Sequence, residues 1–159
     1  MRYRYHSTVP RGLVMRNTVW AFVGVLILAA CGGGTATIAT PTPAINFTMA
    51  VQNNSGVSGT GQIVKGTGSF TLTIKLTGLP ASSSHISHIH TGSCAKPGGV
   101  AYALQQVIAD SSGAATVTST VSTDYVIPAG GWYVNVHHGP DFSAPANGPS
   151  VTCGDLSAA

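Results

Sequence analysis

The sequence predicts an all-β domain, folded as an antiparallel Greek-key β-sandwich or barrel. Apolar and polar residues alternate with a period of two in several segments, and Gly, Pro, Ser and Asp residues separate these segments. Helical spacing of apolar residues is nearly absent, and only residues 100–108 are compatible with a short helix as well as with a strand. Short strands rich in Thr and Val with turns between them are typical of sandwiches and barrels.

The clearest alternation lies at residues 45–52 and 70–77. In the first segment Ile45 and Phe47 alternate with polar residues, and in the second Leu72 alternates with threonines. Turn signals such as Pro-Gly-Gly and Pro-Ala-Gly-Gly bound the remaining candidates. Further strands are expected at 59–64, 85–90, 100–108, 114–121 and 132–138.

Residues 1–30 have the layout of a secretory leader. An apolar run at 18–30 is too short to span a bilayer comfortably and ends in small residues before Cys31. The string Leu-Ala-Ala-Cys resembles a bacterial lipobox, which implies cleavage before Cys31 and acylation of its thiol. We therefore expect a lipoprotein signal peptide and an extracytoplasmic domain anchored to the membrane by lipid, in the periplasm or at the cell surface. The alternative is an ordinary signal peptide with an incidental cysteine.

The chain after the leader is weakly acidic. All four arginines lie in the first sixteen residues, so the part from Cys31 onward carries three lysines, four aspartates and a net charge of −1. Without arginine or a basic patch it cannot neutralise a row of phosphates, which disfavours nucleic-acid binding. Residues 31–43 are rich in Gly, Thr, Ala and Pro and predict a flexible tether, which leaves 44–159 as the folded domain.

Three cysteines occur in the chain. With Cys31 lipidated, Cys94 and Cys153 remain as one natural pair in an oxidising compartment. We expect a disulfide between them, and two buried free thiols are the alternative.

The histidines of the domain lie in two short segments. His88 and His90 are two residues apart and should project from one face of a strand, while Ile89 between them points to the core. His137 lies opposite the valine face of the segment 132–138. If the two strands are neighbours, three imidazoles converge on the outer side of the sheet. The alternative is a set of surface histidines that bind no metal.

Such a cluster predicts a copper site, with zinc as the less favoured ion. Imidazole suits both metals, the absence of carboxylates disfavours magnesium and calcium, and intrinsic affinity peaks at copper. His85 and His138 point to the opposite faces, so we interpret them as supporting or ordinary residues, with His138 as a fallback ligand if a bulge shifts the register. Asp141 is either a hydrogen-bond acceptor for a ligand histidine or a solvated turn residue.

Two families resemble this sequence at these residues. The stretch SHISHIHTGSC (84–94) is similar to the copper-ligand strand and half-cystine of Cu,Zn superoxide dismutases, and Thr-Cys-Gly around Cys153 resembles their second half-cystine. Over about residues 44–140, TGSFTLTIKLTGLP, HIH and GGWYVNVHHG also resemble the CHRD domain. The resemblance implies a dismutase-like sandwich with His88, His90 and His137 as copper ligands.

The sequence departs from the dismutases in ways that bear on activity. No histidine lies between His90 and His137 to bridge to a zinc ion, and Ser150 occupies the position of the arginine that guides superoxide. We therefore expect a copper-binding protein for storage, delivery or tolerance, and not an efficient enzyme. The alternatives are a copper-only dismutase-like enzyme and a metal-free surface interaction module. The sequence does not identify a protein partner.

Overall fold

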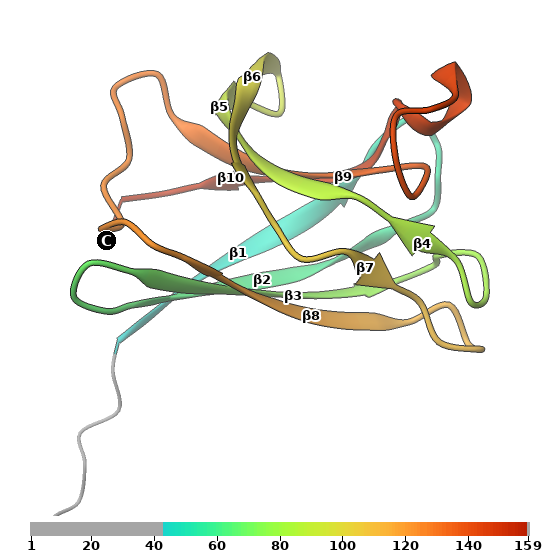
Figure 1. Cartoon of the computed structure of the whole chain (residues 1–159), viewed down its shortest axis with the longest axis horizontal. Coiled ribbons are helices and arrows are strands. Elements are labelled where there is room, and N and C mark those ends of the chain that lie inside the picture. Colours follow the sequence, from blue (N-terminus) through green and yellow to red (C-terminus); the bar gives the residue numbers. More distant parts are fainter. Residues whose placement is uncertain (1–42, 159) are drawn as a thin grey trace, which may run out of the picture. The chain divides into compact units, whose positions relative to one another are not determined.

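A computed structural model of the chain describes residues 43–158 (Figure 1). The expected signal peptide at 1–30, the lipidated Cys31 and all but the last residue of the expected tether lie outside the described residues. Within residues 43–158, no helix is long and apolar enough to cross a membrane.

The described residues form an all-β domain, as predicted. Eight strands build one antiparallel sheet in the order β6-β5-β9-β10-β1-β2-β3-β8, and β4 pairs with β7 as a separate two-stranded ladder. The only helical element among the described residues is a single 3-10 turn, Pro145–Asn147. The strands are β1 Ala44–Val51, β2 Ser58–Lys65, β3 Phe70–Thr77, β4 Ser84–His85, β5 Ser87–Ser93, β6 Lys96–Ala103, β7 Val107–Ile108, β8 Ala115–Val121, β9 Trp132–His137 and β10 Ser150–Leu156.

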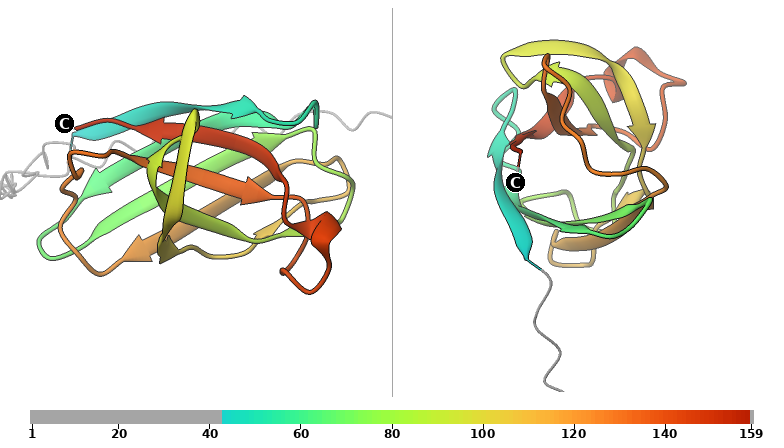
Figure 2. Two further views of the ribbon diagram at one scale, coloured as in Figure 1. Left: turned by 90° about the horizontal axis from the view of Figure 1, so that it is seen from above. Right: turned by 90° about the vertical axis from the view of Figure 1, so that its left-hand side faces the viewer.

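The large sheet curls around the hydrophobic core. In Figure 1 strands β1, β2, β3 and β8 form one side, and β5, β6, β9 and β10 lie across from them. The end-on view in Figure 2 shows the strands wrapped into a half-barrel. The alternation in the sequence explains this packing. Successive residues of a strand point to opposite faces, and in these strands the apolar residues point inward. The fully buried side chains include Ile63, Phe70, Leu72, Ile74, Ile89, Val134 and Val136.

Two strand predictions need correction. Segment 85–90 is divided between β4 and β5, and segment 100–108 between β6 and β7, with no helix in the second. Strand β10 was missed altogether, although it lies between β9 and β1 near the middle of the sheet. Most of its residues are buried on both faces, so its apolar and polar residues do not alternate.

The predicted disulfide between Cys94 and Cys153 is present. It joins the turn after β5 to β10 with a Cα–Cα distance of 5.9 Å and a sequence separation of 59 residues. The backbone N–H of Cys94 also donates to Asp155 Oδ1 at 2.7 Å. In the chain-entropy model, closing a loop of this length stabilises the fold by about 4 kcal/mol.

Candidate metal centre

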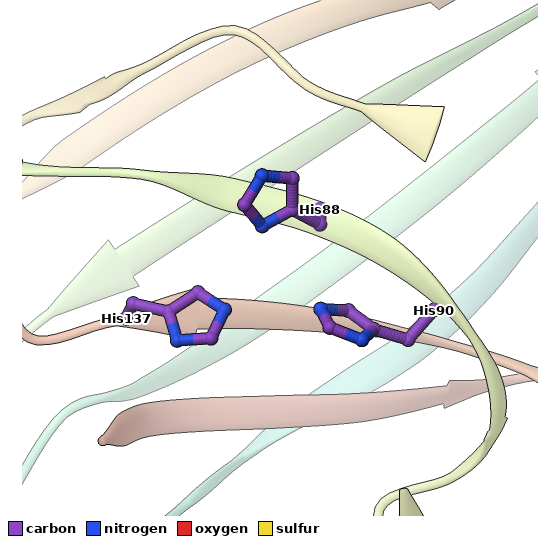
Figure 3. Close-up of side chains that lie close together, drawn as sticks. All are labelled: His88, His90 and His137. Carbon is purple, nitrogen blue, oxygen red and sulfur yellow. The ribbon is translucent and has the colours of Figure 1, made fainter. Parts of the chain in front are cut away.

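Three histidines from two adjacent strands converge on one space. His88 and His90 lie on β5, and His137 lies on β9, which pairs with β5 in antiparallel register. One ring nitrogen from each residue lies within 4.8 Å of the others, and no other such group of metal-ligating side chains occurs among residues 43–158. Figure 3 shows the three rings facing one another. Nitrogens that share one ion at about 2.1 Å are about 3.5 Å apart, so a small closure of the rings accommodates a metal.

The alternation of β5 and β9 produces this convergence. Ile89, Val134 and Val136 are fully buried in the core, which places the three histidines on the opposite face. The sequence suggested that this face is open to solvent. In the structure it is covered instead, because His90 is only 8% exposed and His137 only 6% exposed. Residues of β6 and of the segment 138–149, which leads from β9 to β10, contact the rings and cover them.

Backbone carbonyls fix the tautomers of two rings. His137 Nδ1–H donates to the carbonyl oxygen of Gly148 at 2.6 Å, and His90 Nδ1–H donates to that of Gly98 at 3.1 Å. A carbonyl only accepts, so in each neutral ring the proton is on Nδ1 and the lone pair is on Nε2. Both rings therefore present an unprotonated Nε2 that can bind a metal.

Gly98 brings its carbonyl to His90 because it has no side chain. A Cβ atom at this position would overlap the side-chain and main-chain oxygens of Thr91 on the paired strand. The close approach of the two backbones thus depends on glycine.

Two ring nitrogens in the cluster have no hydrogen-bond partner. His88 Nδ1 and His90 Nε2 are buried, and no group among residues 43–158 hydrogen-bonds to either. Leaving a buried polar atom unpaired costs about 1–3 kcal/mol, so such atoms are rare in folded proteins. A metal ion bound to both nitrogens would remove this penalty, and the donor set fits one.

The surroundings favour the neutral form of His88 and His137. Burial lowers the pKa of His88 below its ordinary value of 6.5, and the neighbouring His137 and His90 lower it further. Burial also lowers the pKa of His137, although its hydrogen bond to Gly148 opposes the shift. Neutral imidazole is the metal-binding form, so the lowered pKa values of His88 and His137 favour metal binding at neutral pH.

Two aromatic rings that the sequence did not assign to the site flank the cluster. Tyr133 is buried and stacks on His90 with ring centroids 5.1 Å apart. Phe142 stacks on His88 at 5.9 Å with an interplanar angle of 11° and meets His137 edge-on at 4.9 Å. It is nevertheless 57% exposed, so it covers the histidines on one side and faces solvent on the other.

The structure separates the other predicted residues from the cluster. His85 is buried behind it, donating from Nδ1 to the main-chain oxygen of His137 at 2.9 Å, which is a supporting position. His138 is exposed and is not part of the cluster. Asp141 Oδ1 accepts hydrogen bonds from Ser143 and Asn147, so it organises a turn and does not orient a ligand histidine.

The prediction also missed Asn135, a buried polar residue on the same face as His137. Its Nδ2 lies 3.3 Å from His137 Nε2, and its Oδ1 accepts a hydrogen bond from Ser150. The available signal was its position two residues before His137, because residues at i and i+2 on a strand share a face.

The chain carries a recognised domain over most of its folded part. The CHRD domain matches residues 32–140, more than half of the 159 residues of the chain. Comparison with curated proteins finds no match. The curled antiparallel sheet, the strand with His88 and His90 and the strand with His137 all begin within the matched span. The chain belongs to the CHRD domain family.

Proposed function

We propose that this protein binds copper outside the cytoplasm, with His88, His90 and His137 as ligands, and serves copper storage, delivery or tolerance. The observation that carries the proposal is the pair of buried, unpartnered imidazole nitrogens beside His137. No group among residues 43–158 hydrogen-bonds to them, whereas a metal ion would coordinate their lone pairs. When bound, copper would supply one-electron redox chemistry at this position.

The donor set favours copper over other ions. Three neutral nitrogens without a carboxylate are poor ligands for magnesium and calcium. Among first-row divalent metals, copper binds such sites most tightly, and zinc is the second candidate. Both cysteines of the described residues are joined in the disulfide, so neither offers a thiolate that competes for the ion.

The proposed location is extracytoplasmic, with the protein anchored to a membrane in the periplasm or at the cell surface. A disulfide and a CHRD domain both fit an extracellular protein. We propose further that residues 1–30 are a lipoprotein signal peptide, that lipidated Cys31 anchors the chain, and that residues 31–43 tether the domain 44–159. Mass spectrometry of the protein from a membrane fraction tests this, because an unmodified Cys31 thiol would exclude the anchor.

Copper titration of purified protein tests the metal site. We expect one Cu²⁺ per chain and a spin-resonance spectrum with nitrogen couplings. His137→Ala should abolish this spectrum. His138→Ala is the matched control, because it removes an adjacent but exposed imidazole and should leave copper binding unchanged. Equal copper binding by both variants would refute the ligand set.

A second candidate function is superoxide dismutation by copper alone. The disulfide from the turn after β5 to β10 favours it, because the dismutases that the sequence resembles carry the corresponding half-cystines. Ser150 in place of the guiding arginine argues against efficient turnover. Superoxide consumption that His88→Ala abolishes would support the enzyme. Failure to bind either copper or zinc would leave a metal-free interaction module as the function.

A further inference from the structure

We propose that the side-chain oxygen of Asn135 is a fourth ligand of the metal, reached by a half-turn of its carboxamide when the ion binds. This inference rests on the proposed function, since it needs a metal on the three histidines. It assigns a ligand to a residue that is neither charged nor an imidazole.

Asn135 lies at the base of the three-histidine cluster. It is directly opposite His88 in the pairing of β5 with β9 and two residues before His137 on the same face. Directly opposed residues on paired strands have Cβ atoms about 5 Å apart. Its side chain is 7% exposed, so its amide must find partners inside the protein.

The present hydrogen bond of Asn135 cannot persist in a metal complex. Its Nδ2–H donates to His137 Nε2 at 3.3 Å. Nε2 is the only lone pair that His137 can offer, because its Nδ1–H is bonded to Gly148. An ion on Nε2 therefore displaces the amide, which must be paired again without leaving the buried site.

Ser150 lets the amide turn without losing its own hydrogen bond. Its hydroxyl now donates to Asn135 Oδ1, and the carbonyl oxygen of Thr152 lies 3.3 Å from it as a second acceptor. A hydroxyl both donates and accepts. After the half-turn, Ser150 accepts from Asn135 Nδ2 and donates to Thr152, while Oδ1 takes the place of Nδ2 beside the ion.

The register of β10 explains why Ser150 is in reach. Its pairing with β9 shifts between Ser150 and Thr152, so that Ser150 lies opposite His137 while Thr152 lies opposite Val136. Such a bulge re-aims a side chain relative to a regular strand. Amide oxygens also suit the role, since side-chain and main-chain amides act as weak extra ligands in copper sites.

Copper affinity and azide binding test the inference on the full-length chain purified in detergent. Asn135→Ala should weaken Cu²⁺ binding about tenfold, the lower end of the loss typical when a group supporting a metal site is removed. It should also tighten azide binding to the bound copper, because azide then enters a vacated position. Asn135→Asp should restore copper affinity, since a carboxylate offers oxygen in either orientation. Asn46→Ala, which removes an exposed amide on β1, is the control and should change neither value.

The outcomes separate this inference from the proposed function. If the wild-type chain binds no Cu²⁺, both the proposed function and this inference are refuted. If it binds Cu²⁺ but Asn135→Ala weakens azide binding, Asn135 donates a hydrogen bond to an outside ligand and is not itself a ligand. Unchanged copper affinity in Asn135→Ala would also overturn the inference.

A measurement on the unaltered chain covers the case in which Asn135→Ala does not fold. In ¹⁵N NMR spectra, adding Zn²⁺ should shift the side-chain NH₂ signal of Asn135 strongly and leave that of Asn46 in place. If the Asn135 signal does not move when the histidine signals do, the inference is refuted.

Discussion

Gly98→Ala should damage the metal site without touching a ligand. The added Cβ would overlap Thr91 at both its hydroxyl and its main-chain oxygen. Turning the threonine side chain relieves only the first overlap, so the two backbones must separate. Overpacking of this kind costs about 1–3 kcal/mol. For a domain of this size that lowers the melting temperature by roughly 4–12 °C.

The separation also moves the Gly98 carbonyl away from His90. His90 Nδ1–H then loses its acceptor, and the ring no longer holds its Nε2 lone pair toward the other histidines. Loss of such an orienting partner weakens metal binding about 10- to 100-fold. Both effects have one cause, so Cu²⁺ affinity by competition and thermal unfolding of the metal-free protein should change together.

Gly99→Ala is the matched control. It places the same methyl group on the next residue of β6, where no atom lies within 4 Å of the new Cβ. We expect copper affinity and melting temperature close to those of the wild type. Equal losses in the two variants, or no loss of copper affinity in Gly98→Ala, would show that the carbonyl of Gly98 does not hold His90.

Three further predictions concern the cover, the protonation and the disulfide of the domain. Phe142→Ala should let a chelator remove copper faster, because the ring covers His88 and His137; an unchanged rate in stopped-flow absorbance would exclude this role. The metal-free protein should lose stability in acid, since the lowered pKa values of His88 and His137 make the unfolded chain bind protons first. The contribution of the two histidines to the free energy of unfolding is complete above about pH 6.5 and is lost as the pH falls through their lowered folded-state pKa values. Urea unfolding should therefore show a free energy of unfolding that depends less on pH in His88→Asn than in the wild type. Reducing the Cys94–Cys153 bond should lower the free energy of unfolding by about 4 kcal/mol. Urea unfolding with and without reductant measures this, and an unchanged midpoint would contradict it.

The sequence was most informative where one face of a strand is buried. In β5 and β9 the pattern identified Ile89 and Val134 as core residues and thereby placed the histidines on the other face. Such a pattern gives the direction of each side chain, but it does not give the neighbours of a strand. Strand β9 starts 39 residues after the end of β5. That the two strands nevertheless lie side by side depends on the packing of the whole sheet.

The covering of the site could not be read from alternation. Phe142 and Gly148 lie in a segment without periodic apolar residues, and the structure alone brings them onto His137. Strand β10 could not be predicted from alternation either, because Gly154 and Asp155 are residues that are uncommon in strands and interrupt the pattern. The sequence therefore predicted the ligand candidates but not the groups that hold them in place.

The groups that support the histidines bear on whether membership of the CHRD family by itself implies a metal site. The CHRD match ends at residue 140, whereas the acceptor for His137, the partner of Asn135 and the second half-cystine are Gly148, Ser150 and Cys153. The three histidines and the Gly98 carbonyl that orients His90 thus belong to the matched span, but the tautomer of His137 and part of the cover over the rings depend on the segment that follows it. Metal binding in a CHRD domain should accordingly depend on a following strand that pairs with the histidine strand as β10 pairs with β9. A domain with both histidine segments but no such strand would present the same imidazoles to solvent, where water satisfies them and a bound ion gains much less.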